Sequence, residues 1–174
     1  MATITYTVTV ATGTNQYSAN ANKFYINGEV SPVLELQEGN TYIFDQSDST
    51  NGTGGGHPLR FSATANGTWG TAPGGGAGVI YTTGVTTTGT PGNAGANTTI
   101  VVAPVQNVGA PVLFYYCSNH SGMGNTALTT PPTSGETFFN PSMDEIIEEA
   151  FERTSMRGTR TGYQLRSARR SLNI

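Results

Sequence analysis

One cysteine, two histidines and one methionine stand out because their side chains can bind a metal ion together. Cys117, His120 and Met123 lie within one seven-residue stretch, and His57 lies upstream between a glycine run and Pro58. A thiolate and two imidazoles bind copper strongly, and a thioether serves as the long, weak axial ligand of type 1 copper centres. The chain has 1 cysteine and 2 histidines, so this set uses all of them.

These side chains meet only if two distant segments end at the same place in the fold. The apolar run over residues 112–116 leads directly into Cys117 and predicts a strand that ends at the thiolate, under a hydrophobic shell. We expect His57 to arrive from a neighbouring strand that ends at the same pole. Cys117, His120 and Met123 then point into one concavity if the loop turns after the strand.

Other interpretations of these residues are open. Zinc fits the set less well, because a thioether is a poor ligand for zinc. A cysteine nucleophile with His57 or His120 as its base lacks an evident acid or amide partner. The same residues are consistent with a fold that has kept its shape without a metal, because fold does not imply function. The part of the chain that carries this set offers no clustered carboxylates, no second metal set and no positioned base, so we expect no enzymatic activity.

Composition and charge exclude several other classes of protein. A net charge of -3 and a pI of about 5.2 do not fit a nucleic-acid-binding domain, which needs a basic face. No run approaches the roughly 20 apolar residues of a membrane span, and the first residues lack the pattern of a signal peptide. We therefore expect a protein that contacts neither nucleic acid nor membrane and is not exported by that route. A single cysteine excludes an internal disulfide framework.

Residues 1–128 have the pattern of an all-β domain. Ile4 to Val10 alternates apolar and polar residues with the period of two of a half-buried strand. The other strand candidates are short, and no helical pattern separates them: residues 23–26, 33–36, 41–45, 59–62, 79–83, 98–102 and 112–116. About eight short strands predict a sandwich or a barrel. Two glycine-rich loops, residues 52–56 and 70–78, are expected on the surface and lack the lysine and hydroxyl pair of a phosphate loop.

The chain changes character after this β-rich part. Residues 1–135 contain Lys23 and Arg60 as their only cations, whereas the segment from Glu136 carries the other six arginines. Residues 129–141, rich in Thr, Pro and Ser, are the expected linker, because adjacent prolines stiffen the chain and end a strand. The sequence thus predicts a domain over residues 1–128 and a short helical appendage over residues 142–174.

Apolar residues recur at helical spacing in this C-terminal segment. One side of the first predicted helix, opposite an acidic side, carries Met143, Ile146, Ile147, Ala150 and Phe151. A second helix is expected over residues 161–172. Two helices this short need a docking surface, since isolated helices below roughly 12–15 residues are marginal in water. The expected docking residues are Ile146, Ile147, Phe151, Tyr163, Leu165, Arg166, Arg169 and Leu172.

Residues 1–130 resemble a cupredoxin. The resemblance rests on the strand into Cys-x2-His-x2-Met, on Gly-His-Pro upstream and on the pattern of short strands, and the ligand-loop spacing is similar to that of amicyanin. It implies a Greek-key β-sandwich in which His57, Cys117 and His120 are equatorial copper ligands. Met123 would be the axial ligand. In cupredoxins an asparagine usually follows the first ligand histidine and ties the two ligand loops together, whereas this chain has Pro58.

The C-terminal segment carries a second resemblance. Residues 144–153 and 160–173 are similar to the opening of tailed-phage virion proteins at the head-to-tail adaptor or tail tube. In that group the helical domain continues well past this point, so the resemblance implies that the opening helices were kept here as a docking module. A charged helix pair that closes the sandwich is the alternative.

Together the two resemblances imply a virion structural protein, such as a decoration, adaptor or tail-associated protein. Its helices would dock on another virion protein, either portal, adaptor, tail or capsid, while the sandwich projects outward. Such a protein is made in the host cytoplasm, and we expect it to be a homo-oligomer in the particle. The rival expectation is a type 1 blue-copper electron-transfer protein, which cycles copper between two oxidation states.

Overall fold

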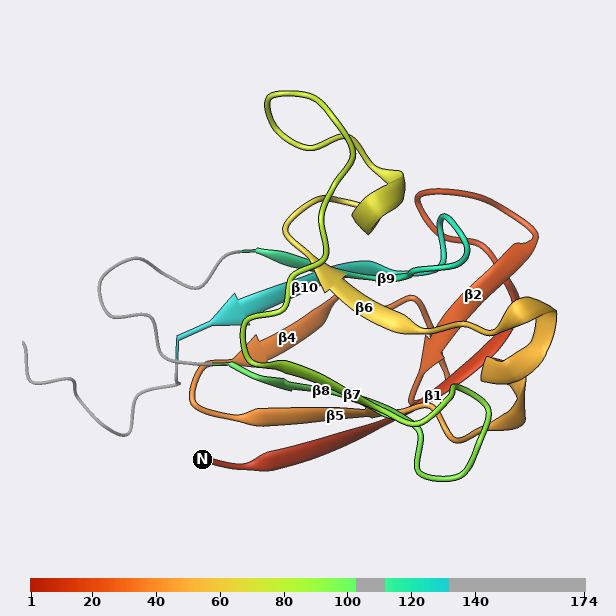
Figure 1. The fold of residues 1–174 in the computed structure, drawn as a ribbon, viewed down its shortest axis with the longest axis horizontal. Coiled ribbons are helices and arrows are strands. Elements are labelled where there is room, and N and C mark those ends of the chain that lie inside the picture. The colour runs from red at the N-terminus through yellow and green to blue at the C-terminus, as the bar shows by residue number, and fades with distance from the viewer. Residues whose placement is uncertain (103–111, 132–174) are drawn as a thin grey trace, which may run out of the picture. The chain divides into compact units, whose positions relative to one another are not determined.

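Two β-sheets pack face to face in the computed structural model, which describes residues 1–102 and 112–131 (Figure 1). The larger sheet has the strand order β3-β2-β1-β5-β8-β7, and the smaller sheet has the order β4-β10-β9-β6. The strands are β1 (Thr3–Gly13), β2 (Ala21–Ile26), β3 (Glu29–Val30), β4 (Leu34–Gln37), β5 (Thr41–Asp45), β6 (Leu59–Ser62), β7 (Val85–Thr88), β8 (Asn97–Val101), β9 (Leu113–Cys117) and β10 (Asn125–Thr130). Two short 3-10 helices, η1 (Ser49–Gly55) and η2 (Gly67–Trp69), lie in the connections on either side of β6.

Alternating residues of the strands fill the space between the sheets. In β5, Tyr42 and Phe44 are buried while their neighbours are half-buried, which is the period of two of a strand with one core-facing side. Phe44 of the larger sheet meets Phe61 of the smaller sheet edge to face, with ring centroids 5.4 Å apart. Burial of apolar area in this core stabilises the fold by roughly 25 cal/mol per Å². The prediction of a mainly β fold with two packed sheets is confirmed.

The chain crosses repeatedly between the sheets, so strands that are distant in sequence become neighbours. β1 pairs antiparallel with β2 and parallel with β5, and β10 pairs parallel with β4 and antiparallel with β9. β6 and β9 lie side by side and antiparallel, with Leu59 opposite Cys117. The start of β6 and the end of β9 therefore meet at one pole of the fold.

One of the expected strands is misplaced, while each of the others overlaps a strand of the structure. The candidate over residues 79–83 is wrong: Tyr81 makes only an isolated bridge to Phe61, and the strand in this region is β7. Val79 and Ile80 are apolar but exposed. Apolar residues alone are therefore not enough to predict a strand over residues 79–83.

The sequence does not predict β10, because four of its six residues are polar threonine or asparagine. β10 lies between β4 and β9, so backbone pairing on both sides holds it in the sheet. Thr129 and Thr130, expected at the start of the linker, belong to this strand, and the sandwich extends past residue 128. The predicted helices over residues 142–174, with their docking residues, lie outside the described residues.

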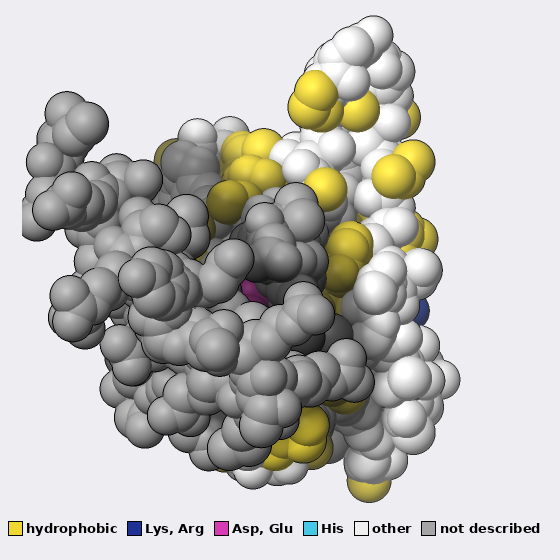
Figure 2. Space-filling view, turned by 90° about the vertical axis from the view of Figure 1, so that its left-hand side faces the viewer, with side chains coloured by type: hydrophobic (Ala, Val, Ile, Leu, Met, Phe, Trp, Pro, Cys, Tyr) yellow, Lys and Arg dark blue, Asp and Glu magenta, His cyan; other side chains and the backbone are white. Residues whose placement is uncertain are grey.

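The connection between β6 and β7, residues 63–84, projects from the sandwich (Figure 1). We call it the projecting segment. It has no charged residue, and hydrophobic side chains are visible on its surface (Figure 2). Trp69, Val79 and Ile80 are the large apolar side chains exposed on it. The two glycine-rich loops are largely exposed as expected, although residues 52–55 also form part of η1.

A lysine is buried on β2. Lys23 is fully buried, and its ammonium group donates a hydrogen bond to Ser18 Oγ at 2.7 Å. Burial lowers the pKa of this ammonium group. A cation held by a neutral hydroxyl and, at 3.4 Å, by the carbonyl oxygen of Asn22 costs free energy, because it has lost part of its hydration.

We expect Lys23→Met to raise the free energy of unfolding at pH 7 by about 1 kcal/mol, because the substitution removes a buried charge and nearly keeps the side-chain volume. The pKa of Lys23 is lowered in the folded state, so the unfolded chain holds more protons between that pKa and about 10.4. Wild-type stability therefore rises with pH through this window, and the advantage of the variant shrinks. Urea unfolding of both proteins at pH 7 and pH 9.5 measures the difference. A variant less stable than wild type at pH 7 would show that the bond to Ser18 outweighs the cost of burial.

Candidate metal centre

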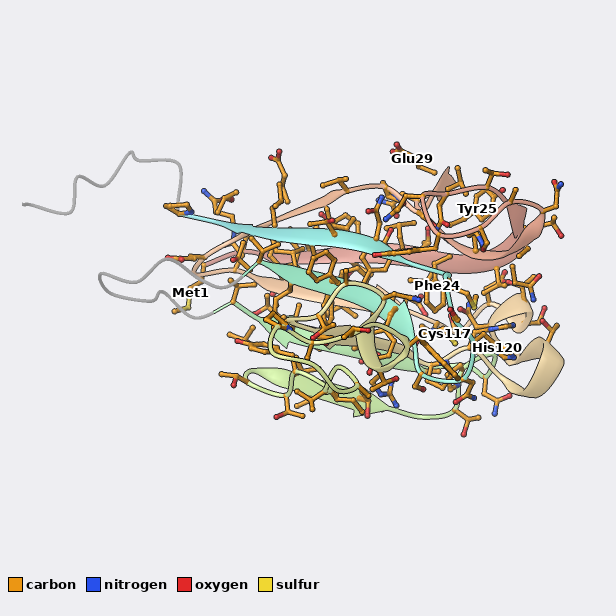
Figure 3. The ribbon with its side chains drawn as sticks, turned by 90° about the horizontal axis from the view of Figure 1, so that it is seen from above. Met1, Phe24, Tyr25, Glu29, Cys117 and His120 are labelled. Carbon is orange, nitrogen blue, oxygen red and sulfur yellow. The ribbon has the colours of Figure 1, made fainter. Side chains whose placement is uncertain are left out.

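Three of the four predicted ligands come together at one pole of the sandwich. Cys117 Sγ lies 3.9 Å from His57 Nδ1 and 3.6 Å from His120 Nδ1. The three donor atoms all lie within 4.8 Å of one another, and the imidazole ring centroids are 4.6 Å apart. Cys117 and His120 lie at the end of the sandwich opposite Met1 (Figure 3). The expectation that His57, Cys117 and His120 lie close together at one pole is confirmed.

The spacing of the donor atoms fits a bound metal ion. Bond lengths of about 2.3 Å to sulfur and about 2.0 Å to nitrogen, at tetrahedral angles, separate the two donor atoms by about 3.5 Å. The sulfur-to-nitrogen distances of 3.6 and 3.9 Å are close to that value. The sulfur atom thus lies at a suitable distance from each of the two imidazole nitrogens to share a metal ion with it.

The pairing of β6 with β9 brings two loops together. We call them the ligand loops: residues 46–58, which precede β6, and residues 118–124, which follow β9. Leu59 is opposite Cys117 in the ladder, and the next backbone bond runs from Ser118 N–H to the carbonyl oxygen of Pro58 at 3.1 Å. His57 lies just before β6 begins, whereas the sequence places it at the end of a strand. The pole is the expected one, but the strand direction is reversed.

His57 is anchored from the interior by the buried side-chain amide of Gln46 and by the backbone carbonyl group of Asn51. Gln46 donates to the carbonyl oxygen of His57 at 2.7 Å and accepts from Leu59 N–H at 3.0 Å. The carbonyl oxygen of Asn51 accepts from His57 N–H at 2.7 Å, and the Asn51 side chain donates to the carbonyl oxygen of Val8 at 2.6 Å. The histidine backbone is therefore fixed to both sheets.

Met123, the fourth predicted ligand, is buried in the core cluster that also contains Cys117. Its carbonyl oxygen accepts hydrogen bonds from Phe24 N–H at 2.9 Å and from Ser31 Oγ at 3.0 Å. The backbone at this position is therefore fixed by the larger sheet. The role of the thioether as an axial ligand stays a prediction.

Two glycines allow the chain to turn around Met123. Gly122 has a φ of 74°, in the left-handed region that favours glycine. A β-carbon at Gly124 would lie 1.9 Å from the carbonyl oxygen of Tyr115. The side-chain amide of Asn15 donates to the carbonyl oxygens of both glycines, at 3.1 and 3.0 Å. This part of the ligand loop is held without help from a metal.

The projecting segment holds the same loop from another side. Trp69 Nε1–H donates to the carbonyl oxygen of Cys117 at 2.9 Å. The Asn66 side chain accepts from Gly122 N–H at 2.8 Å and donates to Ser121 Oγ at 3.0 Å. The ligand loop is therefore enclosed by elements from both sheets.

Burial controls the protonation of the two buried ligands. Burial raises the pKa of the Cys117 thiol, although two backbone N–H groups and the Arg60 guanidinium act in the opposite direction. Burial, and then the charge of His120, lower the pKa of the His57 imidazole. The neutral thiol and the neutral imidazole are thus favoured in the metal-free protein. Metal binding must release the thiol proton, whereas His57 already has the protonation state of a ligand.

His57 interacts through one of its ring nitrogens. Its Nε2 is buried and has no hydrogen-bond partner among the described residues, while Nδ1 faces the thiol. When Nδ1 binds a metal ion, the ring proton is carried by Nε2. A buried donor without a partner costs about 1–3 kcal/mol, which the metal bond must offset.

Sequence reasoning missed the residues that hold the ligands in place, namely Asn15, Gln46, Asn51, Asn66, Trp69 and Asn119. Most of them carry side-chain amides, and they occur in segments rich in Gly, Ser and Thr, where asparagine ordinarily forms turns. Trp69 is the one tryptophan of the chain. It meets Cys117 only in the folded structure, so no periodic pattern in the sequence predicts the contact.

Comparison of the chain with protein-family models, with curated proteins and with solved structures finds no match. No helix in the described part of the chain is long and apolar enough to cross a membrane. The donor atoms of His57, Cys117 and His120 are by themselves suited to holding a metal ion.

We expect Gln46→Leu to lower the free energy of unfolding by about 2–4 kcal/mol, because it leaves the His57 carbonyl and the Leu59 N–H buried without partners. Urea unfolding measures the change. The matched control is Gln16→Leu, which removes an exposed amide bond to Asn125 and should change the stability by less than about 0.5 kcal/mol. Equal stabilities of the two variants would contradict the anchoring role of Gln46.

Proposed function

We propose that this chain is a structural protein of a tailed-phage virion. In this proposal the sandwich is a cupredoxin-like Greek-key domain with a copper-capable centre that projects outward, and the C-terminal segment docks on another virion protein. The virion role is supported by the sequence of residues 144–153 and 160–173, which resembles the opening of phage adaptor or tail tube proteins. The observation that carries the copper site is the spacing of its three donor atoms.

The order of the ligands along the strands supports the cupredoxin-like domain. His57 precedes β6, Cys117 ends β9, and His120 and Met123 lie in the loop that leads to β10. The chain also crosses between the two sheets and makes neighbours of strands that are not consecutive, as the connections of Greek-key sandwiches do.

Copper is the metal that this donor set fits best. A thiolate and two imidazoles with a weak axial thioether form the type 1 arrangement, and soft ligands favour copper in its reduced state. Calcium and magnesium need oxygen ligands, and the cluster consists of two histidines and one cysteine. When bound, the copper ion would supply one-electron redox chemistry, and His57, Cys117, His120 and Met123 would hold it.

Addition of Cu(II) to the purified protein is expected to give a strong visible absorption from thiolate-to-copper charge transfer. Cys117→Ser should abolish the band, and Met123→Leu should keep it with an altered position, since only the axial ligand changes. Copper at about 100 times its dissociation constant should add about 2.7 kcal/mol to the free energy of unfolding. A colourless protein without copper-dependent stabilisation would contradict the copper site and leave the sandwich as a scaffold.

The composition of the sandwich and the helical pattern of the C-terminal segment support the virion role. A Gly- and Thr-rich sandwich with one lysine suits an outward-facing virion domain, because it presents few charges to its neighbours. The apolar side of the predicted helices would be buried on portal, adaptor, tail or capsid protein, and several copies would assemble in the particle. The residues expected in that contact are Ile146, Ile147, Phe151, Tyr163, Leu165, Arg166, Arg169 and Leu172.

Deletion of residues 136–174 is expected to abolish incorporation into particles while leaving the sandwich folded, because the docking residues are removed and the described strands are kept. Phe151→Glu should reduce incorporation through one buried position, and Glu148→Gln on the opposite helix side is the matched control. Protein composition of purified particles, with thermal unfolding of the truncated chain, measures both effects. Normal incorporation of the truncated protein would contradict the proposed virion role, in which the C-terminal segment docks on another virion protein.

A second candidate function, type 1 copper electron transfer, is favoured by the exposure of one ligand. His120 is half-buried, whereas His57 and Cys117 are fully buried. A partly exposed imidazole gives an electron a short path from the surface to copper, and the buried ligands restrict solvent access to the metal. Rapid reversible reduction of the copper protein, together with absence of the full-length chain from purified particles, would make this candidate the better one.

A further inference from the structure

The residue after His57 does not tie the two ligand loops together through its side chain. That residue is Pro58, which has neither an N–H group nor a polar side chain. Its carbonyl oxygen accepts the single backbone bond from Ser118 at 3.1 Å. Any side-chain connection between the loops must therefore come from elsewhere.

Asn119 makes that connection from the opposite loop. Its side-chain amide donates to the carbonyl oxygens of Gly55 and Gly56, at 3.1 and 3.2 Å. Asn119 lies between two of the three ligands in sequence, and Gly56 directly precedes the third. One side chain therefore spans both ligand loops.

Packing does not fix the glycine run that Asn119 holds. Gly55 and Gly56 have φ values of 92° and 85°, and no atom of the described residues lies within 4 Å of a β-carbon built on either of them. An open glycine backbone loses much conformational freedom when it is ordered. The two hydrogen bonds from Asn119 offset part of this entropy cost on the surface side of the loop. Gln46 and Asn51 bond His57 on its interior side.

We propose that Asn119 is a positioning residue of the metal centre, which sets the separation between the Cys117 thiol and the His57 imidazole by joining their loops. Gln46 and Asn51 fix His57 from the interior, and Asn119 fixes the same loop from the surface. The functional meaning of this inference rests on the proposed copper site, although the loop separation is also a property of the metal-free protein. Residues that orient metal ligands commonly contribute about 10–100-fold to metal affinity.

Asn119→Asp is the sharpest variant, because it keeps the side-chain shape and replaces the donor amide with an oxygen that repels both carbonyl groups. Asn119→Ala removes the two bonds without adding repulsion. Asn119 is exposed, so neither variant should unfold the protein. The matched control is Asn40→Ala, since Asn40 accepts from Ala2 N–H at 2.7 Å and donates to Gln37 Oε1 at 3.2 Å, next to Met1 at the opposite end of the sandwich (Figure 3).

Reaction of the metal-free protein with an aromatic disulfide reagent tests the inference without copper. The chain has 1 cysteine, and Cys117 is fully buried, so its rate of reaction reports how often the loops separate. Both Asn119 variants should react about 10-fold faster than wild type, because two hydrogen bonds no longer oppose opening. The Asn40 variant should react at the wild-type rate, and the midpoint of thermal unfolding should be the same for the Asn119 variants and wild type.

Copper loading tests whether the same contact positions the metal. Asn119→Asp should bind Cu(II) at least about 10-fold more weakly than wild type, with a shifted or weaker charge-transfer band. If wild type binds no copper, the proposed copper site fails, and the thiol reaction alone decides the inference. A wild-type rate of thiol reaction in both Asn119 variants overturns the inference. So does an unchanged copper affinity and spectrum in a variant whose thiol reacts faster.

Discussion

The antiparallel pairing of β6 with β9 is the constraint on which the rest of this structure depends. Leu59 opposite Cys117 fixes the start of one strand against the end of the other, so the loops that carry the ligands leave the sheet side by side. Side chains alternate between faces along a strand, and a slip of one residue would turn Cys117 out of the core. The register of one pair of strands thus decides both the burial of the thiol and its distance from His57.

Within the described residues, neutral side-chain amides hold the loops that follow from this register. Asn15, Gln46, Asn66 and Asn119 each bond backbone groups of the segments around the ligands. An amide both donates and accepts, so it satisfies loop backbone groups that no strand pairs. Because these groups carry no charge, burial remains the main influence on the pKa values of Cys117 and His57.

The parts of this fold that the sequence predicts are those with a distinct chemical or periodic pattern. β5 alternates buried and half-buried residues over its whole length, and three of the four predicted ligands are the only cysteine and histidines of the chain. β10 lacks such a pattern, because pairing on both sides rather than apolar side chains holds its threonines in the sheet. The connection between the ligand loops cannot be predicted from the sequence either. Pro58 suggests that the connection is lost, yet Asn119 provides it by donating to the backbone carbonyl groups of Gly55 and Gly56. Every residue type has a backbone carbonyl group, so the sequence does not mark these acceptors.

The positions of the two cationic side chains in the sandwich affect how fast a protease can cleave it. Lys23 is fully buried within β2, and Arg60 is half-buried within β6, where its guanidinium donates to the carbonyl oxygen of Leu59 at 2.8 Å. Trypsin cuts after lysine or arginine and must bind several residues of extended, unpaired chain. Both of its recognition points in residues 1–135 are inside hydrogen-bonded strands. Tryptic cleavage of the sandwich therefore has to wait for a strand to leave its sheet, and its rate reports how often that happens.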